Sequence, residues 1–144
     1  MDEYLAAAVE QAKQAMAMGG VPIGSVLVLD GAIVGQGHNR QNQMQSVIRH
    51  AEMDCIDNAG FLKSNDYQRS VIYTTLSPCD MCAGAMIFFN IPKVVIGENV
   101  NYKGAEEYLH SRGIEVEVLN DPDCIQMLQE FDEQNPGIWN KGDD

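Results

Sequence analysis

The sequence predicts a three-layer α/β/α sandwich built on a mixed sheet of about five strands. Two observations carry this prediction. Short runs of β-branched and aromatic residues alternate along the chain with segments of helical periodicity. The last strand, helix and strand follow one another in an order that implies a right-handed parallel crossover. Since the 144 residues contain no internal repeat or low-complexity linker, we expect a single domain over residues 1–144.

The first third of the chain is expected to form a helix and a hairpin. Apolar residues at helical spacing predict a helix over residues 3–18, which ends at Gly19-Gly20. Two strands follow, at residues 25–30 and 32–36. Asp30-Gly31 joins them, and this dipeptide is typical of a tight hairpin turn.

The middle of the chain is expected to supply a second helix, a strand and a third helix. Residues 38–49 are polar and predict a loop, and residues 50–59 predict a short helix. Residues 70–76 (SVIYTTL) are rich in β-branched and aromatic residues, which favours a strand. Ser77-Pro78 then opens a helix that runs to about Asn90, because proline is tolerated in a first helical turn.

The last third of the chain predicts the crossover itself. Residues 93–97 form an apolar strand, residues 104–112 a helix and residues 114–119 a further strand. A final helix is expected over residues 122–133.

Two short motifs, His50-Ala51-Glu52 and Pro78-Cys79-Asp80-Met81-Cys82, predict a catalytic zinc site. Both stand where helices are expected to begin, and a helix N-terminus favours thiolate over thiol. Cys79 and Cys82 are three residues apart and therefore lie on one face of their helix. With His50 they make three protein ligands, which leave the fourth tetrahedral position of Zn²⁺ open to water. Glu52 need not bind the metal and is expected to move protons.

Each motif alone has a less specific interpretation. A lone His-x-Glu usually occurs by chance on a protein surface. A lone Cys-x-x-Cys in a cytosolic chain can be a redox pair. The two together are similar to the signature of the zinc nucleobase deaminases. Cys55 and Cys124 stand alone in the sequence, which favours an open catalytic site over a closed structural one.

Charge and composition limit the kinds of substrate and the cellular location that we expect. The formal net charge is −12, and the nine Lys and Arg residues form no cluster. This argues against a nucleic-acid substrate but not against a small neutral base; a role in solubility alone is the alternative. No apolar run is long enough for a membrane span, and the first residues are unlike a signal peptide. Four cysteines without a disulfide pattern indicate a reducing compartment, so we expect a cytoplasmic protein.

Over nearly its whole length the chain resembles fungal-type cytosine deaminase, of the zinc-dependent cytidine/deoxycytidylate deaminase superfamily. The stretches that carry the resemblance are Gly19–Gly24 (GGVPIG), Gly37–Asn39 (GHN), Tyr73–Cys82 (YTTLSPCDMC), Gly97–Asn101 (GENVN) and Trp139. The resemblance implies a cytidine deaminase-like fold and hydrolysis of a free nucleobase, cytosine, to uracil and ammonia in pyrimidine salvage. It also implies a homodimer with one catalytic Zn²⁺ per subunit.

The resemblance further implies a substrate pocket. In this pocket Asn39 and the peptide N–H of Ala51 would bind the ring carbonyl, and the carbonyl of Ser77 would accept from the amine. Ile23 and Leu76 would line the wall. Tyr102 and Trp139 would cover the ring. The residues themselves support part of this, because the amide of Asn39 offers both a donor and an acceptor to a ring. A turn-forming role for Asn39, and a tail anchor in the case of Trp139, are the alternatives.

The sequence departs from the family at two points. Ala51 stands where the family has Gly, and Gly142 stands where it has an Asp that contacts the amine side of the base. Asp143 is the nearest candidate to substitute. A related ring such as isocytosine, creatinine or a guanine-like base is therefore an alternative substrate.

Two other functions compete with a free-base deaminase. A tRNA adenosine deaminase shares the zinc motifs but requires a basic surface and a basic C-terminal segment to bind RNA. The C-terminal segment of this chain, FDEQNPGIWNKGDD, is acidic. An inactive zinc-stabilised binding module would have no use for the carboxylate of Glu52.

Overall fold

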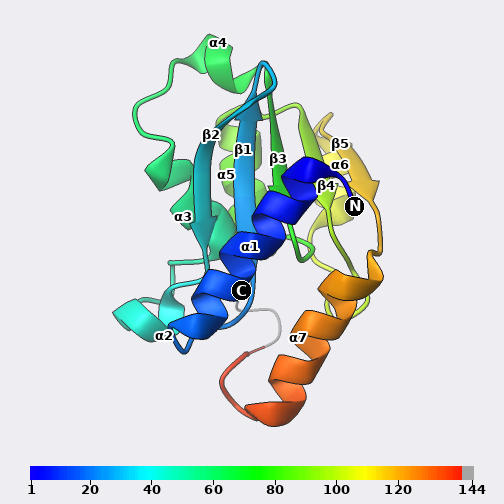
Figure 1. Cartoon of the computed structure of the whole chain (residues 1–144). Coiled ribbons are helices and arrows are strands. Elements are labelled where there is room, and N and C mark those ends of the chain that lie inside the picture. The colour runs from blue at the N-terminus through cyan, green and yellow to red at the C-terminus, as the bar shows by residue number, and fades with distance from the viewer. Residues whose placement is uncertain (141–144) are drawn as a thin grey trace.

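The computed structural model describes residues 1–140 and arranges them as three layers, with helices on both faces of one sheet (Figure 1). The sheet has five strands in the order β2-β1-β3-β4-β5. β1 pairs antiparallel with β2 and β3, whereas β3, β4 and β5 are parallel. The strands are β1 (Gly24–Leu29), β2 (Ala32–His38), β3 (Ser70–Thr74), β4 (Lys93–Ile96) and β5 (Glu115–Val118). The predicted mixed α/β sandwich is confirmed.

The two faces of the sheet are covered by different helices. Side chains alternate along β1, so that Leu27 packs in one cluster with α3 (Ala51–Asn58), α5 (Asp80–Phe88) and α6 (Glu106–Ser111). Val26 and Val28 point to the opposite face and pack against α1 (Glu3–Ala17). α7 (Pro122–Gln134) lies on the α1 side, where Cys124 meets Leu5 and Val9 of α1 (Figure 1).

Local sequence explains how these elements begin and turn. The carboxylate of Asp2 accepts hydrogen bonds from the first N–H groups of α1, and Asp121 does the same for α7. Asp30 and Gly31 have φ values of 51° and 81°, the left-handed pair that a two-residue hairpin requires. The expected hairpin therefore forms where the sequence indicates it.

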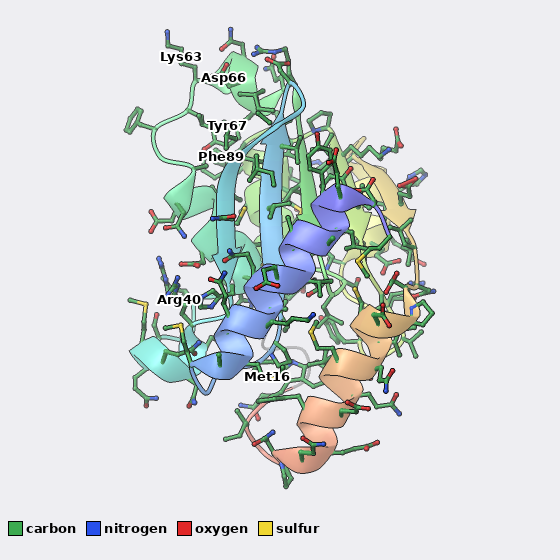
Figure 2. All side chains as sticks on the ribbon, viewed as in Figure 1. Met16, Arg40, Lys63, Asp66, Tyr67 and Phe89 are labelled. Atoms are coloured by element: carbon green, nitrogen blue, oxygen red, sulfur yellow. The ribbon has the colours of Figure 1, made fainter. Side chains whose placement is uncertain are left out.

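Two one-turn helices were not expected from the sequence. α2 (Gln41–Met44) interrupts the segment 38–49, which the sequence predicts as loop, and α4 (Ser64–Tyr67) precedes β3. A single turn is too short to show apolar periodicity. α4 is held by tertiary packing, since the ring of Tyr67 stacks on that of Phe89 with centroids 5.0 Å apart (Figure 2).

Candidate zinc site and substrate pocket

The three predicted zinc ligands come together at the starts of α3 and α5. His50 is the N-cap residue of α3, Cys79 is the N-cap residue of α5, and Cys82 lies in the first turn of α5. His50 Nδ1 is 3.4 Å from the Sγ of Cys79 and 3.6 Å from the Sγ of Cys82. The three ligand atoms lie within 4.8 Å of one another, and all three residues are buried.

These distances fit a tetrahedral zinc ion. Zn–S bonds of about 2.3 Å and Zn–N bonds of about 2.0–2.1 Å place a nitrogen and a sulfur ligand about 3.5 Å apart. Both observed N···S distances are close to that value. One imidazole and two thiolates are a donor set that zinc prefers, so His50, Cys79 and Cys82 would hold the metal.

The two cysteine thiols are electrostatically coupled. The hydrogen bond between them lowers the pKa of Cys79 to about 4, an effect that burial opposes and the neighbouring His50 reinforces. The same hydrogen bond, together with burial, raises the pKa of Cys82 above its usual range. One negative charge is thus favoured on Cys79 by the protein alone, and a divalent cation would stabilise the second on Cys82.

Glu52 lies in the first turn of α3, almost completely buried beside the ligands. Burial, followed by the nearby Cys79, raises the pKa of Glu52 to about 7. A carboxyl group with a pKa in this range is suited to accept and donate protons near neutral pH.

The other two cysteines differ from the ligand pair. Cys55 and Cys124 are buried, and neither belongs to the group that could hold a metal within residues 1–140. Burial raises the pKa of each thiol to about 12. Both are therefore neutral thiols at physiological pH.

Most of the predicted pocket residues form one buried cluster. Ile23, Leu76 and Trp139 pack together with Ala51, which sits between His50 and Glu52 in the chain, and Tyr102 packs against them. The cluster is completed by Val21, Leu128 and Phe131. Trp139 is 4% exposed, so the segment after α7 folds back onto the ligand-bearing end of the sheet.

Asn39 and Ser77 are buried at the edge of this cluster. The N–H of Asn39 donates to the carbonyl of Ile23 at 3.0 Å. The hydroxyl of Ser77 donates to Glu106 at 2.6 Å and accepts from the N–H of Gly104 at 2.9 Å. Asp143 and Gly142 lie outside the described residues.

Sequence reasoning missed the two acids that hold the loop carrying Tyr102. Glu98 is fully buried, and its carboxylate accepts from the N–H groups of Val100 and Asn101 at 2.8 and 2.9 Å. Glu106 accepts from Asn99 at 3.3 Å as well as from Ser77. The available signal was a glutamate placed directly after the apolar strand KVVIG, where an ionisable side chain is buried only if it is hydrogen-bonded.

We expect Glu98→Gln to destabilise the protein by about 1–3 kcal/mol. The amide would turn a donor toward Asn101 Nδ2, which now donates to Glu98 at 2.7 Å. Thermal or urea unfolding measures the loss, with the exposed Glu107→Gln as the matched control. Equal stability of the two variants would show that the buried carboxylate does not hold this loop.

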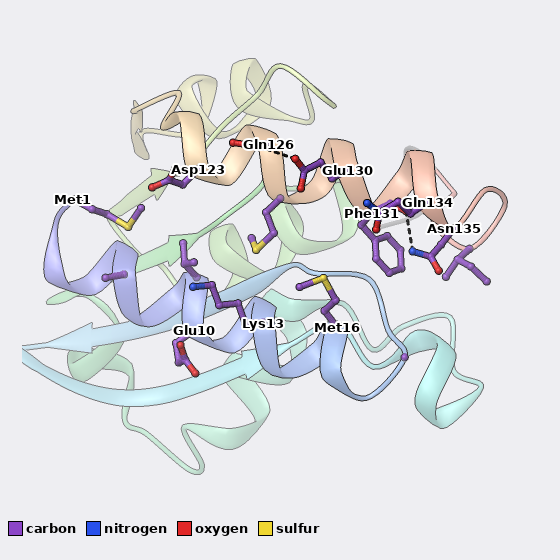
Figure 3. Close-up of a pocket in the computed structure, with 15 residues that line it drawn as sticks. Met1, Glu10, Lys13, Met16, Asp123, Gln126, Glu130, Phe131, Gln134 and Asn135 are labelled. Carbon is purple, nitrogen blue, oxygen red and sulfur yellow. Dashed lines mark hydrogen bonds between the residues drawn. The ribbon is translucent and has the colours of Figure 1, made fainter.

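A groove of about 870 Å³ lies apart from the metal ligands, between α1 and α7 (Figure 3). Met16 of α1 and Phe131 and Asn135 of the α7 end are among its lining residues. Phe131 also belongs to the cluster around Trp139. The groove therefore backs onto the pocket wall but does not contain the zinc ligands.

None of the helices within residues 1–140 has the length and apolar character needed to cross a membrane.

Comparison with known proteins identifies the family. The family described as "Cytidine and deoxycytidylate deaminase zinc-binding region" matches residues 1–98. A cytosine deaminase of Candida albicans is 45% identical over 138 residues, which cover 95% of this chain and 92% of that protein. A tRNA-specific adenosine deaminase of Bacillus subtilis is 43% identical over 95 residues, or 65% of this chain and 59% of that protein.

Solved structures show the same fold. A structure from the tRNA:A34 deaminases superposes with a TM-score of 0.69 at 27% identity, over 81% of this chain and 97% of that one. The resemblance to cytosine deaminase and the expectation of a zinc-binding site are both confirmed. This chain belongs to the cytidine and deoxycytidylate deaminase family of zinc-dependent enzymes.

Proposed function

We propose that this protein is a zinc-dependent cytosine deaminase, which hydrolyses free cytosine to uracil and ammonia. The observation that carries the proposal is the 45% identity to the Candida albicans enzyme over 95% of the chain. That likeness extends well beyond residues 1–98, which the family description matches. It therefore includes much of the C-terminal part that supplies Tyr102 and Trp139.

The residues of this chain divide the reaction between them. His50, Cys79 and Cys82 would hold a zinc ion, which would supply a water molecule of lowered pKa. Glu52 is buried beside these ligands and is the group that would move protons to the ring nitrogen and the leaving amine. Asn39 and the N–H of Ala51 hold the ring carbonyl, and the carbonyl of Ser77 accepts from the amine.

Closure of the pocket selects for size. Trp139 and Leu76 are buried to 4% and 2% exposure, and Tyr102 packs on the same cluster. Aromatic rings enclosed in this way exclude water from the reacting base. If Tyr102 and Trp139 close over a flat base in this way, a ribose on the ring nitrogen does not fit.

We expect ammonia release from free cytosine and negligible release from cytidine. The measurement is a panel of cytosine, isocytosine, creatinine, guanine, cytidine and adenosine, assayed with the zinc-loaded protein. Isocytosine and creatinine are included because Gly142 stands where the family has an Asp, and Asp143 is only a candidate to replace it. If either compound is the best substrate, the deaminase assignment stands and the choice of ring is wrong. If cytidine is the best substrate, the closed-pocket argument fails.

A tRNA substrate is the alternative that the Bacillus subtilis relative raises. The charge of −12 and the dispersed Lys and Arg residues argue against it, because phosphate contacts supply most of the affinity for nucleic acid. Adding tRNA to the panel decides between the two.

We further propose that the enzyme is a cytoplasmic homodimer that serves pyrimidine salvage. Phe61 and Phe88 are strongly exposed near the C-terminal ends of α3 and α5. Large apolar side chains exposed in this way are suited to a subunit contact.

A further inference from the structure

Both ends of the Asn39 side-chain amide hydrogen-bond to Gln41. Asn39 Nδ2 donates to Gln41 Oε1 at 2.9 Å, and Asn39 Oδ1 accepts from the backbone N–H of Gln41 at 3.1 Å. Gln41 is itself anchored, because its Nε2 donates to the carbonyl of Val47 at 2.9 Å. Asn39 is completely buried, whereas Gln41 is only partly so.

This chain of hydrogen bonds has only one consistent direction. A backbone carbonyl can only accept, so the atom of Gln41 that faces Val47 must be its nitrogen. The oxygen of Gln41 then faces Asn39 and requires a donor there. The backbone N–H of Gln41 can only donate, so it requires the oxygen of Asn39. Both backbone groups impose the same orientation on the Asn39 amide.

The orientation of the Asn39 amide determines which hydrogen-bonding groups of a ring it can bind. An amide nitrogen donates two hydrogen bonds and an amide oxygen accepts two, so each atom of Asn39 can bond Gln41 and a ring together. In the fixed orientation the amide offers a donor to a ring carbonyl and an acceptor to the adjacent ring N–H. The reversed orientation would set donor against donor and acceptor against acceptor.

We propose that Gln41 is a positioning residue, which fixes the orientation of the Asn39 amide and thereby makes the enzyme specific for a ring with an adjacent carbonyl and N–H. The inference rests on the proposed function, in which Asn39 binds the base. Gln41 does not act on the substrate; it makes reversal of the Asn39 amide unfavourable, because reversal breaks two hydrogen bonds.

The test uses 4-aminopyrimidine, which is cytosine without the carbonyl and with a bare lone pair at the neighbouring nitrogen. This lone pair opposes the oxygen of a correctly oriented Asn39, so the compound should be a weak competitive inhibitor of the wild type. In Gln41→Leu one of the two restraints is lost. We expect the ratio of its inhibition constant to the KM of cytosine to fall about five- to tenfold, the scale of one hydrogen bond.

Two variants separate positioning from general support of the loop. Gln41→Glu keeps an acceptor opposite Asn39 Nδ2, although it loses the donor to the carbonyl of Val47, and should retain more of the discrimination than Gln41→Leu. Gln43→Leu removes a hydrogen bond to the backbone carbonyl of Asn39 and leaves the amide untouched, so it should leave the ratio unchanged. An unchanged ratio in Gln41→Leu, with cytosine still deaminated, would overturn the inference.

A second readout does not depend on the substrate. Hydrogen exchange of the Asn39 side-chain amide, followed by NMR, should be at least about tenfold faster in Gln41→Leu than in the wild type or Gln41→Glu. If the wild type does not deaminate cytosine, the proposed function fails, and this exchange still decides the role of Gln41. Equal exchange in all three proteins would contradict the proposed restraint.

Discussion

Glu52→Gln should retain zinc and the folded structure but lower kcat for cytosine by about 10²-fold or more, the scale of general acid–base catalysis. The amide keeps the shape of the carboxyl group but can neither accept nor deliver the protons that hydrolysis moves. Glu52 is almost completely buried next to the zinc ligands, and its pKa near 7 places both protonation states within reach. The measurements are steady-state kinetics and zinc content per chain.

The control for this variant is Glu10→Gln, which changes an exposed acid on α1, on the far face of the sheet. It should leave kcat unchanged. A neutral amide avoids burying a negative charge, so Glu52→Gln should unfold at a temperature no lower than that of the wild type. Turnover within a few-fold of wild type would remove Glu52 from the mechanism.

Cys82→Ser should lose zinc and activity together. Cys82 is buried in the first turn of α5, and its sulfur is one of three ligand atoms within 4.8 Å of one another. A serine hydroxyl is a much poorer zinc ligand than a thiolate, and two remaining protein ligands do not make a stable site. Metal analysis after dialysis, together with ammonia release, measures both effects.

The matched control is Cys124→Ala, because Cys124 is equally buried but belongs to the cluster between α1 and α7. This variant should keep about one zinc per chain and lose only some stability, through the small cavity it leaves. Full zinc occupancy in Cys82→Ser would show that the metal is held by a different set of ligands.

The sequence predicts the main elements because their signals are local. Apolar periodicity places α1 and α7, and the Asp30-Gly31 dipeptide places the hairpin. The zinc ligands are equally readable, since His50, Cys79 and Cys82 stand in two short motifs at helix starts. Each of these features depends on residues close together in the chain.

The features that the sequence does not predict depend on distant contacts. α4 is a single turn fixed by the stacking of Tyr67 on Phe89. In the chain, β3 and α5 separate these two residues. Glu106 reads as an ordinary surface acid in the sequence, because the Ser77 hydroxyl that donates to it is 29 residues away. Gln41 shows its connection to Asn39 only when the turn after β2 is formed.

The family match ends at residue 98, before Tyr102, Phe131 and Trp139, which belong to the buried cluster at the proposed substrate pocket. The candidate zinc ligands and the aromatic side chains of this cluster are therefore encoded in successive parts of the chain. Substitutions in the last third of the chain therefore change the aromatic side chains without changing the three metal ligands.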